Sequence, residues 1–210
     1  MGTIKKGILG GFHGKVGTVV GGSWKGITYM RGMAQSIKNP KTEGQMKQRE
    51  KMRNVSAFLQ VMQPVINVGY KNQSAKQSPY SAAMSYILKN AMNDTEINYS
   101  RVLLSRGTLP NVGNLAATSD DSAASISWSY TEGQIGASAS DNICAVAYNK
   151  DKGQMICDSS TATRSEESLD LNYPSGWEAG DKVELYLFTI TADRKNLSDS
   201  AFIAEVTITS

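Results

Sequence analysis

Apolar and polar residues alternate along the second half of the chain, in short stretches that Gly, Asn, Asp and Pro residues separate. Alternation with a period of two is typical of a strand with one buried face, and a series of such strands is typical of an antiparallel sandwich. Trp128 on an early strand and the alternating residues Val183, Leu185 and Leu187 on a later one favour an immunoglobulin-like or fibronectin-III-like core. The pattern predicts strands over residues 124–130, 142–149, 153–158, 167–173, 182–191 and 201–209.

A helical period of three and four residues replaces the alternation in the middle of the chain. The first helix begins near Glu43, and Pro64 ends or kinks it. Its apolar stripe consists of Met52, Val55, Leu59 and Met62. A second helix has Ser78 as its N-cap and Pro79 at its first position. We expect these helices to pack against each other and against a sheet of N-terminal residues, with residues 96–110 as a further strand of that sheet.

The N-terminal residues are rich in glycine, and β-branched and aromatic residues stand between the glycines. This composition predicts two short strands, 16–21 and 25–31, joined by a tight turn at residues 21–23. A glycine within a strand marks a bulge or a place where another backbone comes close. We therefore assign four residues to the close approach of backbone during assembly: Gly17, Gly21, Gly22 and Trp24.

These patterns predict an α+β protein. An N-terminal β-hairpin or sheet with two helices is followed by an antiparallel β-sandwich, immunoglobulin-like or fibronectin-III-like. Because the pattern changes at Asn111, we expect two domains, a basic one over residues 1–110 and an acidic one over residues 111–210. Pro, Gly, Asn and Asp accumulate between Leu109 and Ser122, which predicts preferential proteolysis there.

Charge is distributed unevenly along the chain. Residues 1–76 contain thirteen Lys and Arg residues against two Glu residues, a net charge of +11, although the whole chain carries only +3. Residues 113–210 contain six basic against fifteen acidic residues, a net charge of −9. Such polarity can steer binding to nucleic acid or an acidic partner, or head-to-tail docking of identical copies, and a solvated basic surface without a partner explains it equally well. The basic residues that we assign to phosphate or acidic-partner contact are Lys5, Lys6, Lys15, Lys25, Arg31, Lys47, Arg49, Lys51 and Arg53.

The chemistry of the chain argues against an enzyme. The glycine-rich stretch "GILGGFHGKVGTVVGGSWKG" is not a phosphate-binding loop, because Leu9 stands where the first glycine of G-x-x-x-x-G-K-[ST] is required and Val16 where the hydroxyl is required. His13 is the only histidine, and two distant cysteines cannot complete a recognised zinc pattern with it. We expect no catalytic residue, no metal and no cofactor.

Cys144 and Cys157 fall on two predicted strands joined by a short loop, which would place them opposite each other. A cross-strand disulfide fits this arrangement geometrically. Two free thiols fit a reducing compartment. The sequence leaves both alternatives open.

No run of residues approaches the roughly 20 apolar positions of a membrane-spanning helix. The first residues also lack the continuous apolar stretch of a signal peptide. We therefore expect a cytoplasmic protein, or a virion protein if a phage encodes it, that does not contact a membrane. No small-molecule substrate is indicated.

Three segments carry a resemblance to a known family. They are "MGTIKKGILGGFHGKVGTVVGGSWKGITYMRG" at the start, "SYILKNAM" with "INYSRVLLSRGTLP" in the middle, and "GDKVELYLFTITADRKNLSDSAFIAEVTI" at the end. Along essentially its whole length the chain resembles an uncharacterised protein family of the Bacteroidetes and their mobile elements, also expected in phages. The resemblance implies no activity and no catalytic motif.

Two hypotheses for the function follow from these observations. The first is a structural assembly protein of a phage or phage-like particle, which associates with itself or with other particle proteins. The alternative is a nucleic-acid-binding protein that holds phosphates with its basic N-terminal region. Trp and Tyr beside Lys suit base stacking there, but the pattern favours Trp24 and Tyr29 as core residues of the first domain. Salt distinguishes the two, because binding through several phosphates weakens steeply as salt rises.

Overall fold

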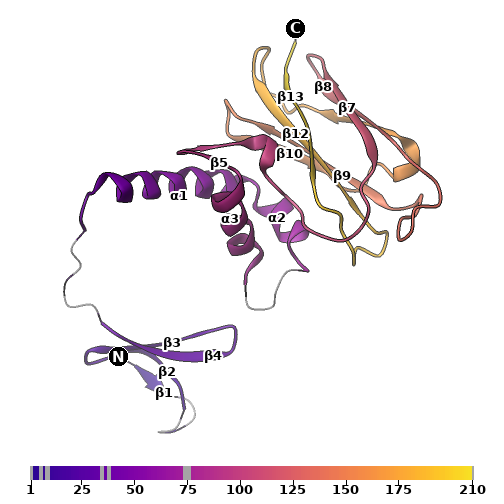
Figure 1. Cartoon of the computed structure of the whole chain (residues 1–210). Coiled ribbons are helices and arrows are strands. Elements are labelled where there is room, and N and C mark those ends of the chain that lie inside the picture. Colours follow the sequence, from indigo (N-terminus) through magenta and orange to yellow (C-terminus); the bar gives the residue numbers. More distant parts are fainter. Residues whose placement is uncertain are drawn as a thin grey trace. The chain divides into compact units, whose positions relative to one another are not determined.

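The computed structural model describes residues 2–4, 7, 10–33, 36, 39–72 and 77–209 (Figure 1). The chain forms two compact units, Met1–Gln45 and Met46–Ser210. This division differs from the expected domain boundary between residues 110 and 111. The difference arises because the helices and the sandwich share a hydrophobic core, so that no boundary separates them.

The N-terminal unit is a four-stranded antiparallel sheet in the order β1-β2-β3-β4. Its strands are β1 (Thr3–Ile4), β2 (Phe12–Val16), β3 (Val19–Trp24) and β4 (Ile27–Gly32). The turns lie at residues 17–18 and 25–26, so the expected turn at residues 21–23 is wrong. Lys25 (φ 46°) and Gly26 (φ 81°) both adopt positive φ, as a two-residue type I′ hairpin turn requires.

Three helices follow, α1 (Glu43–Val61), α2 (Gln63–Gly69) and α3 (Pro79–Asn90). Helix α1 ends before Pro64, as expected, but the chain continues directly into α2, with Pro64 in the first turn. Proline is tolerated there because the first backbone amides of a helix have no hydrogen-bond partner within it. Ser78 caps α3, since its hydroxyl accepts a hydrogen bond from the Ser81 amide at 3.2 Å. On the predicted stripe of α1 and its end, Val55, Leu59 and Met62 are buried, whereas Met52 is exposed.

The sandwich consists of two antiparallel sheets, β10-β9-β12-β13 and β11-β8-β7. All six predicted strands are present: β8 (Ala123–Ser129), β9 (Asn142–Asn149), β10 (Gln154–Asp158), β11 (Ser168–Asn172), β12 (Lys182–Ile190) and β13 (Ala201–Thr207). The additional strand β7 (Gly113–Ser119) was not predicted, because its sequence GNLAATS is poor in strand-forming residues. The fold is therefore a mixed α/β arrangement of mostly antiparallel sheets with a few helices, and its immunoglobulin-like or fibronectin-III-like class stays a prediction.

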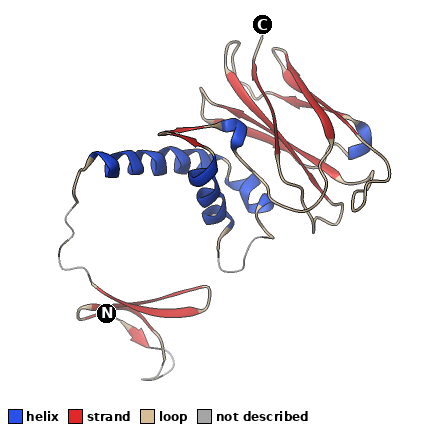
Figure 2. Ribbon diagram, in the orientation of Figure 1, coloured by secondary structure: helices blue, strands red, loops and turns tan. Residues whose placement is uncertain are grey.

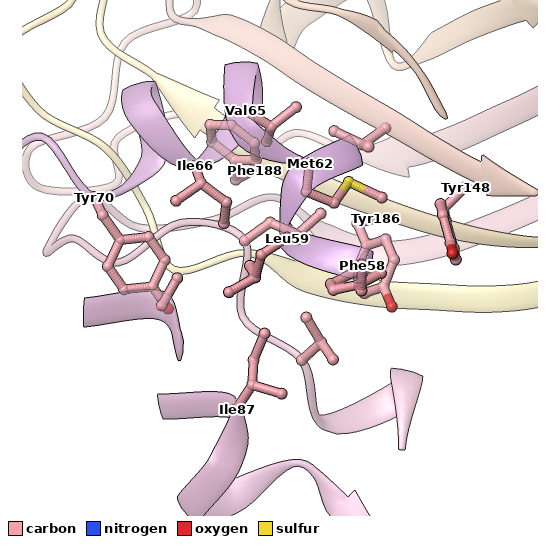
Figure 3. Close-up of a cluster of buried hydrophobic side chains, with 14 of the residues drawn as sticks. Phe58, Leu59, Met62, Val65, Ile66, Tyr70, Ile87, Tyr148, Tyr186 and Phe188 are labelled. Carbon is pink, nitrogen blue, oxygen red and sulfur yellow. The ribbon is translucent and has the colours of Figure 1, made fainter. Parts of the chain in front are cut away.

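Two buried clusters hold together the larger unit, whose helices and strands are distinguished by colour in Figure 2. One lies between the two sheets and includes Trp128, Val183 and Leu185. The other lies between the helices and the opposite face of sheet β10-β9-β12-β13. In that cluster Leu59 and Met62 pack with Tyr186 and Phe188 of β12 (Figure 3). Strand β12 is thus apolar on both faces and contributes to both clusters, so the helices and the sandwich pack as one unit.

The segment from residue 91 to 112 connects the helices to the sandwich and is not the expected extra strand of the N-terminal sheet. It forms the short strands β5 (Met92–Asn93) and β6 (Glu96–Ile97) and a 3-10 turn, η1 (Tyr99–Arg101). The Leu109 amide then donates to the Leu197 carbonyl at 2.9 Å. The stretch is fixed to the sandwich by such hydrogen bonds, which argues against the expected proteolysis between Leu109 and Ser122.

Candidate assembly surface

The alternation of side chains gives the N-terminal sheet two distinct faces. The registers Val20↔Arg31, Gly22↔Tyr29 and Trp24↔Ile27 place these residues on one face, and Lys15 opposite Val20 extends that face onto β2. We call the face formed by Lys15, Val20, Gly22, Trp24, Ile27, Tyr29 and Arg31 the aromatic face. Cations stand at one end of it and large apolar side chains at the other.

Large apolar side chains of this sheet are exposed. Trp24 is 60%, Ile27 67%, Tyr29 50% and Met30 70% exposed. Among the described residues up to residue 45, only Gly21 is buried. A sheet normally covers at least one face with a core. The described part of this unit shows no such cover, so the expectation that Trp24 and Tyr29 are core residues is wrong. Exposed apolar patches of this kind are typical of interaction surfaces.

Two of the four predicted approach residues, Gly21 and Gly17, have a structural reason to be glycine. A Cβ on Gly21 would lie 2.2 Å from the Phe12 carbonyl oxygen, so the start of β2 passes directly over this position of β3. A Cβ on Gly22 would lie 3.0 Å from the far end of the exposed Tyr29 side chain, which can move aside. Gly17 has open space around it but adopts φ +57° in the turn between β2 and β3. Trp24, the fourth predicted residue, is exposed at the end of β3.

The predicted basic residues fall into two sets. Lys15 and Arg31 share the aromatic face, and Lys25 lies in the turn beside it. The second set, Lys47, Arg49, Lys51 and Arg53, lies on α1. The Lys51 ammonium is 3.9 Å from the carboxylate of Asp94, so this lysine already has an acidic neighbour. Lys5 and Lys6 lie outside the described residues.

The residues considered for chemistry remain apart. His13 is an exposed residue of β2 opposite Thr3. Cys157 pairs with Val146 and not with Cys144, so the two cysteines are diagonal neighbours and both are free thiols. The expectation that they lie directly opposite each other is wrong by two residues. Within the described part of the chain, no three His, Cys, Asp or Glu residues gather as metal ligands would.

A second cluster, which the sequence did not suggest, lies on the helix-covered face of the sandwich. The registers place Tyr148, Glu184 and Glu205 in one row across β9, β12 and β13. The Lys150 ammonium is 2.8 Å from Glu184 and also contacts Glu205. It lies 5.4 Å from the centre of the Tyr99 ring. We call these five residues the lysine–glutamate cluster; a glutamate within the apolar run KVELYLF was the signal available in the sequence.

Burial determines the electrostatics of this cluster. The Glu184 side chain is only 3% exposed. Loss of solvation raises the pKa of Glu184, and the nearby Lys150 opposes this increase. The hydrogen bond from Lys150 lowers the pKa of Glu205, which remains partly exposed. Burial likewise raises the pKa of Tyr99 to about 12. One lysine thus lies between two carboxylates, and it connects Tyr99 of η1 with Glu184 of β12 and Glu205 of β13.

The described residues include no helix that is both long and apolar enough to cross a membrane. None of the curated proteins compared with the chain matches it. A model of a family of unknown function, DUF6266, matches residues 11–204. This match includes most of the N-terminal sheet, all three helices and nearly the whole sandwich. The chain therefore belongs to the DUF6266 family of unknown function.

Proposed function

We propose that the chain is a non-enzymatic structural protein that assembles through its N-terminal sheet, as a component of a phage or phage-like particle. The exposed aromatic face carries this proposal, because Trp24, Ile27 and Tyr29 are each at least half exposed on a sheet with a single buried glycine. Burying these side chains against a partner removes apolar area from water, which is the main driving force of association.

The charges of the chain favour a second copy as the partner. The N-terminal unit has seven Lys and Arg residues against one Glu residue, a net charge of +6, whereas residues 113–210 carry −9. Sheet-to-sheet pairing of two N-terminal units would bring like charges together. Docking of the basic sheet on the acidic sandwich of another copy brings opposite charges together, and such head-to-tail contacts propagate into rings or filaments.

Strand β4 adds a geometric reason for assembly. It is the edge of its sheet, and all six of its residues are exposed. An edge strand presents unpaired backbone groups that another strand can pair with. The resemblance to proteins of the Bacteroidetes and their mobile elements supports a phage or phage-like particle as the setting, and the cytoplasm or the virion as the location.

Light scattering of the full chain tests the proposal. We expect oligomers that the double change Trp24→Ser and Ile27→Thr disrupts while the thermal unfolding of the larger unit stays unchanged. Met52→Gln is the matched control, because Met52 is 41% exposed but lies on helix α1, outside both the N-terminal sheet and the sandwich. A wild-type chain that stays monomeric at high concentration would rule out assembly through the aromatic face.

One observation favours nucleic-acid binding as a second candidate. Trp24 and Tyr29 share a face with Lys15 and Arg31, and aromatic rings beside cations suit the stacking of bases over a phosphate backbone. Titration with single-stranded DNA at two salt concentrations tests this candidate. Steeply salt-dependent binding that Lys15→Gln and Arg31→Gln weaken would favour it. Oligomers that persist in moderate salt without DNA would favour the structural protein.

A further inference from the structure

We propose that a cavity between helix α2 and the sandwich binds a small aliphatic carboxylate, an activity separate from assembly. The cavity has a volume of about 200 Å³. Pro64, Val65 and Val68 of α2 form one wall. Phe188 and Ile190 of β12 form the opposite wall. Both walls belong to the larger unit, so the site does not depend on the N-terminal sheet.

The size and lining of the cavity select an apolar group. Engineered apolar cavities of about 150 Å³ stay dry and take up benzene, so the larger space here holds a ring of that size or a short alkyl chain. It is too small for a helix or a strand of a partner protein. The sulfur of the buried Cys144 adds a further soft surface to the lining, and burial raises the pKa of its thiol, which keeps it neutral.

Arg194 supplies the charge that selects an anion. Its residue lines the same cavity from the turn after β12, where Arg194 adopts φ 56°. Asp193 fixes this turn by accepting hydrogen bonds from the Thr191 hydroxyl at 2.6 Å and the Lys195 amide at 3.0 Å. A guanidinium matches the two oxygens of a carboxylate. An apolar chain that ends in a carboxylate therefore fits this site, because its chain contacts the two apolar walls and its carboxylate pairs with Arg194.

The other charges near the site are already engaged. Asp158, the neighbour of Cys157, accepts hydrogen bonds from the amides of Ser160 and Thr161, each at 3.0 Å. Asp193 also forms an ion pair with Lys195 at 3.2 Å. These contacts compensate the two carboxylates, so the Arg194 guanidinium is the group that a bound anion meets. Since Arg194 is exposed, we expect it to favour a carboxylate over an alcohol by only about threefold.

Cys157 provides a built-in reporter of occupancy, because it is exposed and lines the cavity, whereas Cys144 is buried. We expect octanoate to slow the reaction of Cys157 with a disulfide reagent in a saturable manner and to raise the unfolding midpoint of the full chain. Octan-1-ol should protect about threefold more weakly, and octylamine more weakly still. Cys157→Ser should abolish the labelling, which identifies the reporting thiol.

Three variants distinguish the contribution of the apolar walls to binding from that of Arg194. Arg194→Gln should reduce protection by octanoate to the level of octan-1-ol, whereas Lys195→Gln, a change to the next cation of the same turn, should not. Val68→Trp should fill the cavity and block all three probes. The fold should tolerate this larger side chain because Val68 is 40% exposed. Equal protection by octanoate and octylamine, protection that never saturates, or no protection would each overturn the proposal.

Discussion

The ammonium of Lys150 lies 2.8 Å from the carboxylate of Glu184, whose side chain is 3% exposed. Removing one partner of such a pair leaves a buried charge without compensation. We expect Lys150→Met to lower the free energy of unfolding by about 2–3 kcal/mol, below the range for fully buried pairs because Lys150 is itself 23% exposed. Urea denaturation at neutral pH measures this loss.

Lys195→Met is the matched control for that variant. Lys195 also pairs with a carboxylate, that of Asp193 at 3.2 Å, but its side chain is 80% exposed. Exposed pairs contribute about 0–1 kcal/mol, so this change should have little effect. Equal losses in the two variants would show that burial of Glu184 does not determine the outcome.

The pH dependence of stability should reveal the same carboxylate. Burial raises the pKa of Glu184 above its ordinary value of 4.5. Between 4.5 and the raised pKa, the folded state holds a proton that the unfolded state has released, so stability falls as pH rises. Glu205 acts in the opposite direction, because its pKa in the folded state is lowered. The unfolded state therefore binds a proton more readily, and the protein loses stability as pH falls below 4.5.

The variant Glu184→Gln isolates the first window. We expect the fall in unfolding free energy above pH 4.5 to become shallower in the variant, while the behaviour below pH 4.5 stays close to wild type. Urea midpoints measured at several pH values check this. Parallel curves for the two proteins above pH 4.5 would contradict the raised pKa of Glu184.

A second buried pair fixes the segment before β7 to the sandwich. The Nε atom of Arg164 lies 3.2 Å from Asp141, and the two side chains are 0% and 4% exposed. Arg164 also donates to Thr189 and to the Pro110 carbonyl. We expect Asp141→Ala to cost about 3–5 kcal/mol in guanidinium denaturation. Adding Arg164→Met to Asp141→Ala should recover part of this loss, and a single-variant loss below about 1 kcal/mol would contradict the role of the pair.

Much of the sandwich follows from local pattern, because alternation marks which face of a strand is buried. The alternation cannot say what covers that face. In β12, Val183, Leu185 and Leu187 face the other sheet, whereas Tyr186 and Phe188 face the helices. Apolar residues on both faces indicate a strand that is covered on both sides. The other sheet covers one side of β12, and the helices cover the other, so the helices belong to the same compact unit as the sandwich.

The geometry of the candidate assembly surface is predictable only in part from the sequence. Glycines at residues 21 and 22 resemble a turn in sequence, but the structure places them within β3, where the backbone at Phe12 requires Gly21. The true turn uses Lys25 at φ 46°, a conformation that no local propensity of lysine indicates. The lysine–glutamate cluster joins residues from four elements, so spacing along the chain could not reveal it.

Limited proteolysis should separate the two compact units. Lys41 is exposed in the chain between the N-terminal sheet and α1. Arg106 is exposed too, but its amide donates to the Gly69 carbonyl at 3.0 Å, and the Gly107 amide donates to Asp199 at 2.9 Å. Held backbone resists the local unfolding that cleavage requires. We expect trypsin to cut after Lys41 before it cuts after Arg106, and mass spectrometry of early fragments decides the order.

Gly21 offers a sharp test of the N-terminal sheet, because one methyl group there would lie 2.2 Å from a backbone oxygen. Gly32 belongs to the same sheet and has nothing within 4 Å of an added Cβ. We expect Gly21→Ala to disrupt the sheet and, with it, the oligomer. Gly32→Ala should leave both intact, since it meets open space. Light scattering reports the oligomer, and amide hydrogen exchange of residues 12–32 reports the sheet.

Lys15→Ala completes this test, because Lys15 is the residue that a phosphate-binding loop would need. On the proposed assembly surface its exposed charge contributes little to packing, so the oligomer should survive the change. A nucleotide site would reverse the order of sensitivity. ATP would then raise the unfolding midpoint through preferential binding to the folded state, and Lys15→Ala would abolish that increase. Such a result, with Gly21→Ala tolerated, would replace assembly with nucleotide binding as the role of the glycine-rich sheet.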